Sequence, residues 1–182
     1  MSTHIQAFRR RADLLHQSLR NRFPNIPIEV LPSWKSMEFR LQFPSTELSI
    51  TTDQDGYTQI RQCLADIRDV KPDHLFPVLN RWNRVCKVTS FVVGDNLDCV
   101  FAQAGFLFPT HLHFASDQQF LLLLDRFLTE CTMCEEDIHN IIEAEKAETM
   151  YLEMMASFSA VNETIEAALN RIAAIQLDED EQ

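Results

Sequence analysis

Two thiols with the spacing of a redox motif lie in the second half of the chain, at Cys131 and Cys134, and His139 follows them. A Cys-x-x-Cys pair can perform thiol–disulfide exchange when it begins a helix, because the helix dipole lowers a thiol pKa there. Here the pair falls inside a helical pattern of apolar residues, and the sequence has no second such pair to complete a zinc site. Helix packing is therefore favoured, and a redox- or metal-dependent protein stays open as an alternative.

His111 and His113 form a second candidate for chemistry. Two residues apart, they would point to the same side of an extended segment, as metal ligands can do. Spacing identifies no third ligand, so we expect no metal and no cofactor. The three glycines are isolated from one another and form no phosphate-binding loop. No catalytic residue can be singled out, and we expect a protein that is not an enzyme.

Charge is distributed unevenly along the chain. Residues 1–40 contain seven Lys or Arg and three acids, whereas residues 130–182 contain fourteen acids and two bases. The formal net charge of −11 argues against nucleic-acid binding, because phosphate contacts require cations. A basic first helix and an acidic last helix could attract each other within one subunit or between two.

Length and composition predict one domain with a helical extension. A chain of 182 residues that is 46% apolar can bury a core of ordinary size. No apolar run approaches the roughly 18 residues of a membrane span, and no apolar signal region follows the arginines at 9–11. The five cysteines are irregularly spaced, which suits reduced thiols. We expect a cytoplasmic protein without membrane contact.

The apolar periodicity predicts the order helix, sheet, helix, sheet and long helix. The segment 57–64 fits a strand, although its apolar spacing would also suit one face of a helix. Five strands are expected, in an antiparallel sheet of an α+β fold. The expected elements are a helix at 3–22, strands at 36–43, 47–51 and 57–64, a helix with Asp73 as its N-cap, a hairpin at 87–93 and 97–102, and a long helix after Ser116.

The segment Leu79-Asn80-Arg81-Trp82-Asn83 closes the second helix and leads into the hairpin. Asn80 and Asn83 flank Trp82, which the apolar stripe predicts to be buried. Their amides both donate and accept hydrogen bonds, which suits fastening the helix end to neighbouring backbone. We therefore expect Leu79, Asn80, Trp82 and Asn83 to form a structural motif.

The Leu-Asn-Arg-Trp-Asn-Arg motif, with the hairpin and long helix that follow, resembles the YbjN family. This bacterial family is described as sensory transduction regulators, and its fold is similar to that of type III secretion chaperones. The resemblance covers roughly residues 20–145 and implies an α+β fold and a protein-binding role without catalytic chemistry. We expect a domain of this kind at 1–148. The chain continues past the expected end of the family, and its own pattern predicts a helical extension at 149–177 and a disordered acidic tail at 178–182.

Residues 105–114 are unusually apolar for a connecting segment. Aromatic side chains in a loop are costly to expose, so they either roof the core or contact a partner, and both alternatives stay open. We expect a chaperone-like or regulatory protein that holds an unknown partner protein through its sheet or this loop. The candidate contacts are Trp34, Met37, Phe106, Leu107, Phe108 and Phe114.

An apolar seam with heptad spacing follows near the C-terminus. It packs either back on its own domain or against another chain. We expect a homodimer, and a structural subunit of a larger assembly is a further alternative. The seam consists of Phe158, Val161, Ile165, Ala168, Ile172 and Ile175.

Overall fold

The computed structural model describes the backbone of residues 3–107 and 117–180, and the side chains of residues 5–107 and 118–169. Contacts divide the chain into two compact units, Met1–Ile141 and Ile142–Gln182. The last helix contributes to both units. The sequence-based division of the chain after residue 148 stays a prediction. His111, His113, Phe108, Phe114 and Ser116 lie outside the described residues.

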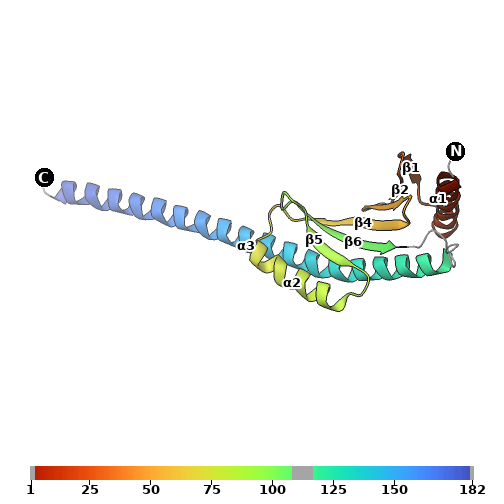
Figure 1. Ribbon diagram of the computed structural model, residues 1–182. Helices are drawn as coiled ribbons and strands as arrows, with labels where there is room; N and C mark the ends of the chain where they lie inside the picture. Colours follow the sequence, from red (N-terminus) through yellow and green to blue (C-terminus); the bar gives the residue numbers. More distant parts are fainter. Residues whose placement is uncertain (1–2, 108–116, 181–182) are drawn as a thin grey trace. The chain divides into compact units, whose positions relative to one another are not determined.

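The described residues form an α+β fold, as the sequence predicts (Figure 1). One helix, four strands, a second helix, two strands and a third helix follow one another along the described residues. The strands form one antiparallel sheet. The elements are α1 (Thr3–Arg22), β1 (Ile28–Pro32), β2 (Ser36–Gln42), β3 (Glu47–Asp53), β4 (Tyr57–Asp66), α2 (Pro72–Val85), β5 (Ser90–Val93), β6 (Cys99–Leu107) and α3 (Asp117–Asp180).

The sheet has the strand order β1-β2-β3-β4-β6-β5, so β1 and β5 are its edges. Sequence reasoning predicted five strands and missed β1, because this segment is short, follows Pro27 and ends in Pro32. Proline lacks an N–H group and is tolerated on an edge strand when that group would point away from the sheet. The pairing of Pro32 with Met37 places its nitrogen on that outer side.

Further boundaries differ from the sequence predictions. The hairpin strands begin later than expected, β5 at Ser90 rather than at residue 87 and β6 at Cys99 rather than at residue 97. The segment from Tyr57 is a strand that extends to Asp66, which decides between the two alternatives. β6 continues to Leu107, so the first part of the predicted loop is strand. Lys71 rather than Asp73 is the N-cap of α2. α3 is helical through Asp180, and the start of the predicted disordered tail is therefore helical.

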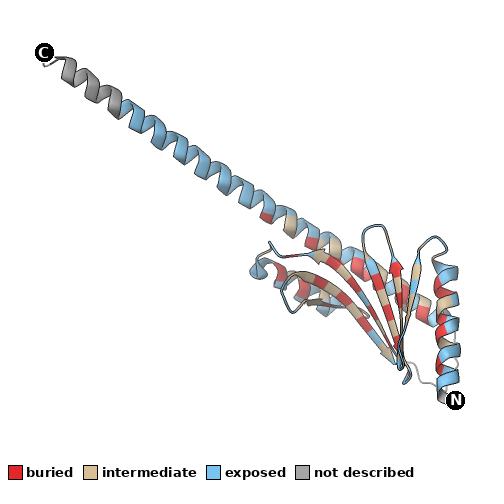
Figure 2. Cartoon of the chain, turned by 90° about the horizontal axis from the view of Figure 1, so that it is seen from above, coloured by how far each residue is buried: buried red, intermediate tan, exposed pale blue. Residues whose placement is uncertain are grey.

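One face of the sheet forms the core, and burial alternates along β3, β4 and most of β6 (Figure 2). Phe39 of this inner face stacks against His16 of α1 with ring centroids 5.8 Å apart. Burial lowers the pKa of His16 below its usual value, and the nearby Arg20 lowers it further. The fully buried side chains include Leu19, Phe39, Leu41, Leu48, Ile50, Ile60, Val100, Phe120, Leu124 and Phe127.

A buried carboxylate joins the first part of α3 to the segment between α2 and β5. Glu130 is 2% exposed, and it accepts the backbone N–H groups of Lys87, Val88 and Thr89 at 3.3, 3.4 and 3.0 Å. Arg126, one turn earlier on α3, donates its Nε to Glu130 at 2.6 Å. Burial alone would raise the pKa of Glu130, but these hydrogen bonds lower it below its usual value.

Asn83 fastens the end of α2 to the edge strand β5. Its Nδ2 donates to the Phe91 carbonyl at 2.9 Å, and its Oδ1 accepts the Phe91 N–H at 2.7 Å. Half-buried Trp82 donates its Nε1 to Asp137 of α3 at 2.8 Å. Both asparagines are exposed, and the hydrogen bonds to Phe91 assign the predicted fastening role to Asn83.

Replacing Asn83 with alanine should lower the free energy of unfolding by about 1–3 kcal/mol, because Phe91 would lose both hydrogen bonds. Asn80→Ala is a matched control from the same helix. It should change stability by no more than about 0.5 kcal/mol, as exposed substitutions usually do. Urea unfolding midpoints of the two variants provide the measurement. Equal losses would show that the Asn83 bridge does not stabilise the fold.

Glu130→Gln should destabilise the fold by about 1.5–3 kcal/mol at neutral pH, as expected for hydrogen bonds to a charged group. The folded-state pKa lies below the unfolded value, so this stability is present above a pH of about 4.3 and is lost as the pH falls through the folded pKa. The wild-type advantage should therefore shrink on acidification, as measured by urea unfolding from neutral to acidic pH. Glu136→Gln, at an exposed position of the same helix, is the control. A stability difference between wild type and Glu130→Gln that did not change with pH would contradict the lowered pKa of Glu130.

Candidate functional site

Three large exposed side chains lie at one end of the sheet, where β1, β3 and β6 end and β2 and β4 begin. The register pairs Ser36 with Asp53 and Tyr57 with Leu107, and the β1–β2 turn contains Trp34. Trp34 is 82% exposed, Leu107 70% and Tyr57 44%. We call these three residues the exposed apolar end.

Local contacts hold the exposed apolar end in place. Lys35 Nζ lies 4.0 Å from the centre of the Trp34 ring, a cation–π contact that brings a positive charge to this end. Asp53 Oδ1 accepts the backbone N–H groups of Asp55 and Tyr57 at 2.9 Å each, which fixes the β3–β4 turn. The Asp53 carbonyl accepts a hydrogen bond from Arg11 of α1.

The Tyr57 ring lies across Gly105 of the neighbouring strand. A Cβ atom built at Gly105 would stand 2.3 Å from Tyr57 Oη and 3.0 Å from its Cζ. The missing side chain therefore lets the ring lie flat against β6 beside Leu107. This glycine serves close approach of a side chain to the strand.

Among the described residues, the outer edge of β1 has backbone groups that pair with no neighbouring strand. Hydrogen bonds from Gln42 N–H to the Pro27 carbonyl and from Ser33 N–H to the Ser36 carbonyl fix which residues of β1 face β2. In the alternating antiparallel pattern, Ile28 and Val30 then direct their N–H and C=O groups away from the sheet. Such an edge can accept another extended strand.

At the opposite edge, formed by β5, a side chain occupies the outward-facing backbone groups of Phe91. Gly94 N–H donates to the Cys99 carbonyl, which places the backbone groups of Phe91 on the outer side of β5. Asn83 satisfies both of these groups with its side-chain amide. The two edges of the sheet thus differ in their capacity to accept a strand.

The outer face of the sheet is polar. Glu38 Oε1 accepts hydrogen bonds from Arg40 Nε at 2.8 Å and Ser49 Oγ at 2.9 Å. The bond from Arg40 contributes most to lowering the Glu38 pKa below its usual value. On the same face, the Arg61 guanidinium lies 4.0 Å from the centre of the Phe101 ring. This face offers paired charges rather than an apolar groove.

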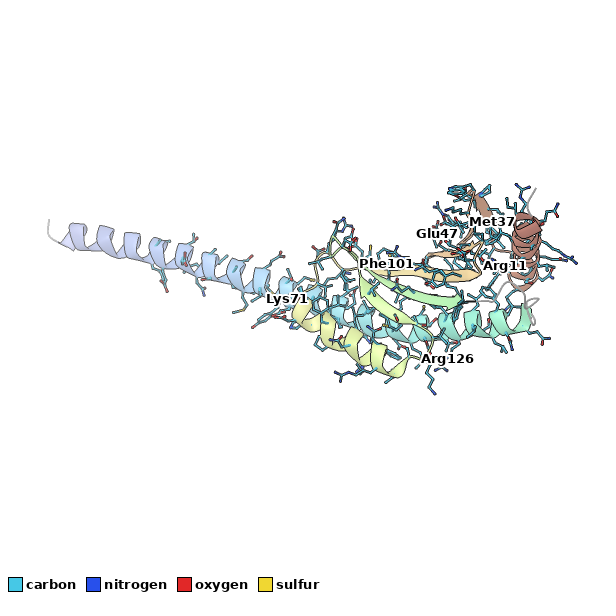
Figure 3. All side chains as sticks on the ribbon, in the orientation of Figure 1. Arg11, Met37, Glu47, Lys71, Phe101 and Arg126 are labelled. Carbon is cyan, nitrogen blue, oxygen red and sulfur yellow. The ribbon has the colours of Figure 1, made fainter. Side chains whose placement is uncertain are left out.

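The structure separates the sequence-predicted partner contacts. Trp34 and Leu107 belong to the exposed apolar end. Met37 and Phe106 are half-buried at inner-face positions of β2 and β6. Figure 3 shows Met37 and Arg11 on the side of the sheet that meets α1. Sequence reasoning missed Tyr57, because its exposure depends on the register that brings it opposite Leu107.

The Cys-x-x-Cys pair lies inside α3 and is buried, with both thiols free. Burial, followed by the nearby groups Cys134, Glu135 and Cys86, raises the pKa of Cys131. Burial and then Cys86 raise the pKa of Cys134 to about 12. His139 is exposed. Within the described side chains no group of His, Cys, Asp or Glu is arranged to hold a metal ion.

A shallow hollow of about 590 Å³ lies along the exposed side of α2. Phe76, Asn80, Arg81 and Arg84 are among its lining residues. Arg81 pairs with Asp137 of α3, so this guanidinium already has an anionic partner. The hollow offers mixed polar and apolar walls without a cluster of groups suited to catalysis.

No helix in the described part of the chain is both long and apolar enough to cross a membrane. No family model matches the sequence, and no curated protein matches it either.

Several solved structures are similar to this chain. YbjN from E. coli has a TM-score of 0.49 and 14% sequence identity, covering 71% of this chain and 91% of that chain. A chain of the ExsC–ExsE complex has a TM-score of 0.48 and 12% identity, covering 68% and 92%. A chain of the HopA1–SchA chaperone–effector complex has a TM-score of 0.46 and 10% identity, covering 69% and 96%. The predicted resemblance to YbjN and type III secretion chaperones is confirmed at this level of likeness.

Iodoacetamide at a pH of about 8 should leave Cys131 and Cys134 unmodified in the folded protein, because both are buried and remain protonated thiols. Both should react after denaturation in urea, which serves as the internal control. Mass spectrometry of the tryptic peptides measures the modification. Rapid labelling of either thiol in the folded protein would contradict this prediction and favour the redox alternative.

Proposed function

We propose that this chain is a non-enzymatic protein-binding module, chaperone-like or regulatory, that holds an extended segment of a partner protein. The segment would lie along the β1 edge and place its side chains against the exposed apolar end. The observation that carries the proposal is the position of Trp34, 82% exposed, in the turn that directly follows the unpaired edge strand.

The β1 edge supports binding of an extended segment rather than a helix. Ile28 and Val30 direct hydrogen-bonding groups outward at alternate residues, which is the spacing that an added strand requires. Pro32 has no N–H, so the number of main-chain bonds is small. Side chains at the end of the sheet must therefore supply much of the affinity.

The exposed apolar end supports a segment that carries apolar side chains next to acidic ones. Trp34 and Leu107 offer apolar area that gains free energy on burial, at roughly 25 cal/mol per Å². Lys35 adds a cation beside Trp34. We place this activity in the cytoplasm, where reducing conditions would keep the five cysteines as thiols.

A displayed library of random peptides, selected on the purified protein, provides ligands of defined sequence for the test. Selected peptides should share apolar and acidic residues and bind with a Kd that calorimetry can measure. Trp34→Ala should weaken binding by about tenfold or more, equivalent to about 1.4 kcal/mol. Phe76→Ala is the matched control, because Phe76 is an exposed aromatic on α2 away from the sheet end, and it should leave the Kd unchanged.

Hydrogen exchange tests the mode of binding independently. The amides of Ile28 and Val30 should exchange rapidly in the free protein and become protected in the peptide complex, because an added strand would accept their hydrogen bonds. The Phe91 amide should change little, since Asn83 already accepts it. Peptides whose affinity is insensitive to Trp34→Ala, or the absence of any selected peptide, would refute the proposed function.

A further inference from the structure

In the unit Ile142–Gln182, α3 carries an apolar seam. This seam begins at Tyr151, one heptad before the Phe158 start that the sequence pattern indicated. The helix is continuous from Asp117 to Asp180, so Tyr151 and Met154 extend the predicted heptad pattern by one repeat. All of the described seam residues are exposed; Phe158, for example, is 60% exposed. In heptad notation, Tyr151, Phe158 and Ile165 occupy position a, and Met154, Val161 and Ala168 occupy position d.

Acidic residues of this segment lie away from the seam. Between residues 150 and 169, Glu153, Glu163 and Glu166 occupy heptad positions c, f and b, and the segment has no basic residue. Positions e and g, which flank a seam, carry no charge in this range. A second copy of the same acidic helix can therefore approach without like charges meeting at the flanks. The flanking residues are Met150, Met155, Ser157, Asn162, Thr164 and Leu169.

We propose that this seam binds the same seam of a second copy in the antiparallel direction, about a two-fold axis at the level of Glu163. In antiparallel pairs an a position meets a d position. The axis sets Phe158 opposite the partner's Ala168 and Val161 opposite the partner's Ile165. The same axis aligns the helix positions of Met154 and Tyr151 with those of Ile172 and Ile175, so that the pairing spans about three and a half heptads.

Side-chain size favours this direction over the parallel one. Antiparallel pairing combines the largest seam residue, Phe158, with the smallest, Ala168. Parallel pairing would set Phe158 against its own copy in one layer and Ala168 against its own copy in another. The first layer would be crowded and the second would leave a void, and both defects destabilise a close-packed interface. A two-fold axis across the helices also gives a closed dimer with identical contacts from both chains.

The flanking positions distinguish the two directions experimentally. In the antiparallel register Met155 lies beside the partner's Leu169, whereas in a parallel pair Met155 lies beside the partner's Met150. The double variant Met155→Glu/Leu169→Lys should therefore place opposite charges together and remain dimeric. The double variant Met155→Lys/Leu169→Lys should place like charges together and raise the dimer Kd by about tenfold or more.

Sedimentation equilibrium of the full chain at about 10 µM provides the readout, with circular dichroism to verify helix content. Leu152→Lys/Ala167→Lys adds the same charge at positions b and c, away from the seam, and should leave the Kd within about twofold of the wild type. The difference between the two flank variants should shrink at high salt. A wild-type monomer at about 100 µM would overturn pairing with a second copy. Equal dimer Kd values for the two flank variants would overturn the antiparallel direction.

Discussion

The bonds between Glu130 and the segment Lys87–Thr89 are the interaction on which the arrangement of the first unit depends. Three consecutive backbone N–H groups follow α2 before β5 begins. A buried carboxylate satisfies them together, and Arg126 balances its charge. Removing the carboxylate would leave the buried Thr89 N–H without its partner, and removing the donors would leave a buried charge. The Glu130 carboxylate and the backbone N–H groups of Lys87–Thr89 therefore depend on each other.

This junction also determines which edge of the sheet is open. Because Glu130 fixes the start of β5, the end of α2 lies within reach of the strand and Asn83 can close the backbone groups of Phe91. β1 has no equivalent cover from a described side chain, and its backbone groups at Ile28 and Val30 point outward. The short strand and Pro32 limit pairing of two such edges with each other. The β1 edge could therefore accept a segment that makes further contacts at the end of the sheet. Pairing with the β1 edge of a second copy is disfavoured.

The sequence contained enough information for the elements whose patterns are local. The alternation from Ser36 to Phe43 predicted β2, and the apolar stripe predicted α2. Leu75 and Leu79 of that stripe are buried as expected, whereas Trp82 is only half-buried. β1 escaped prediction because its strand conformation depends on pairing with β2. The role of Glu130 was not predicted either, because it depends on contact with the distant segment Lys87–Thr89. A glutamate three residues after Phe127, on an apolar helix face, was nevertheless a visible signal. The end of the sheet could not be predicted from the sequence, since only the register of several strands places Trp34, Tyr57 and Leu107 at the same end.

Charge placement on α3 links the net charge of the chain to its capacity for association. A formal charge of −11 keeps identical chains apart at long range, because like charges repel. That repulsion opposes any contact between two copies unless the contacting surface itself is free of acids. Between residues 150 and 169 the acids are confined to positions away from the apolar seam, so short-range packing is not opposed by unpaired charges at its flanks. The repulsion disfavours random encounters between two copies, whereas contact between the two apolar seams would leave the acidic faces directed outward.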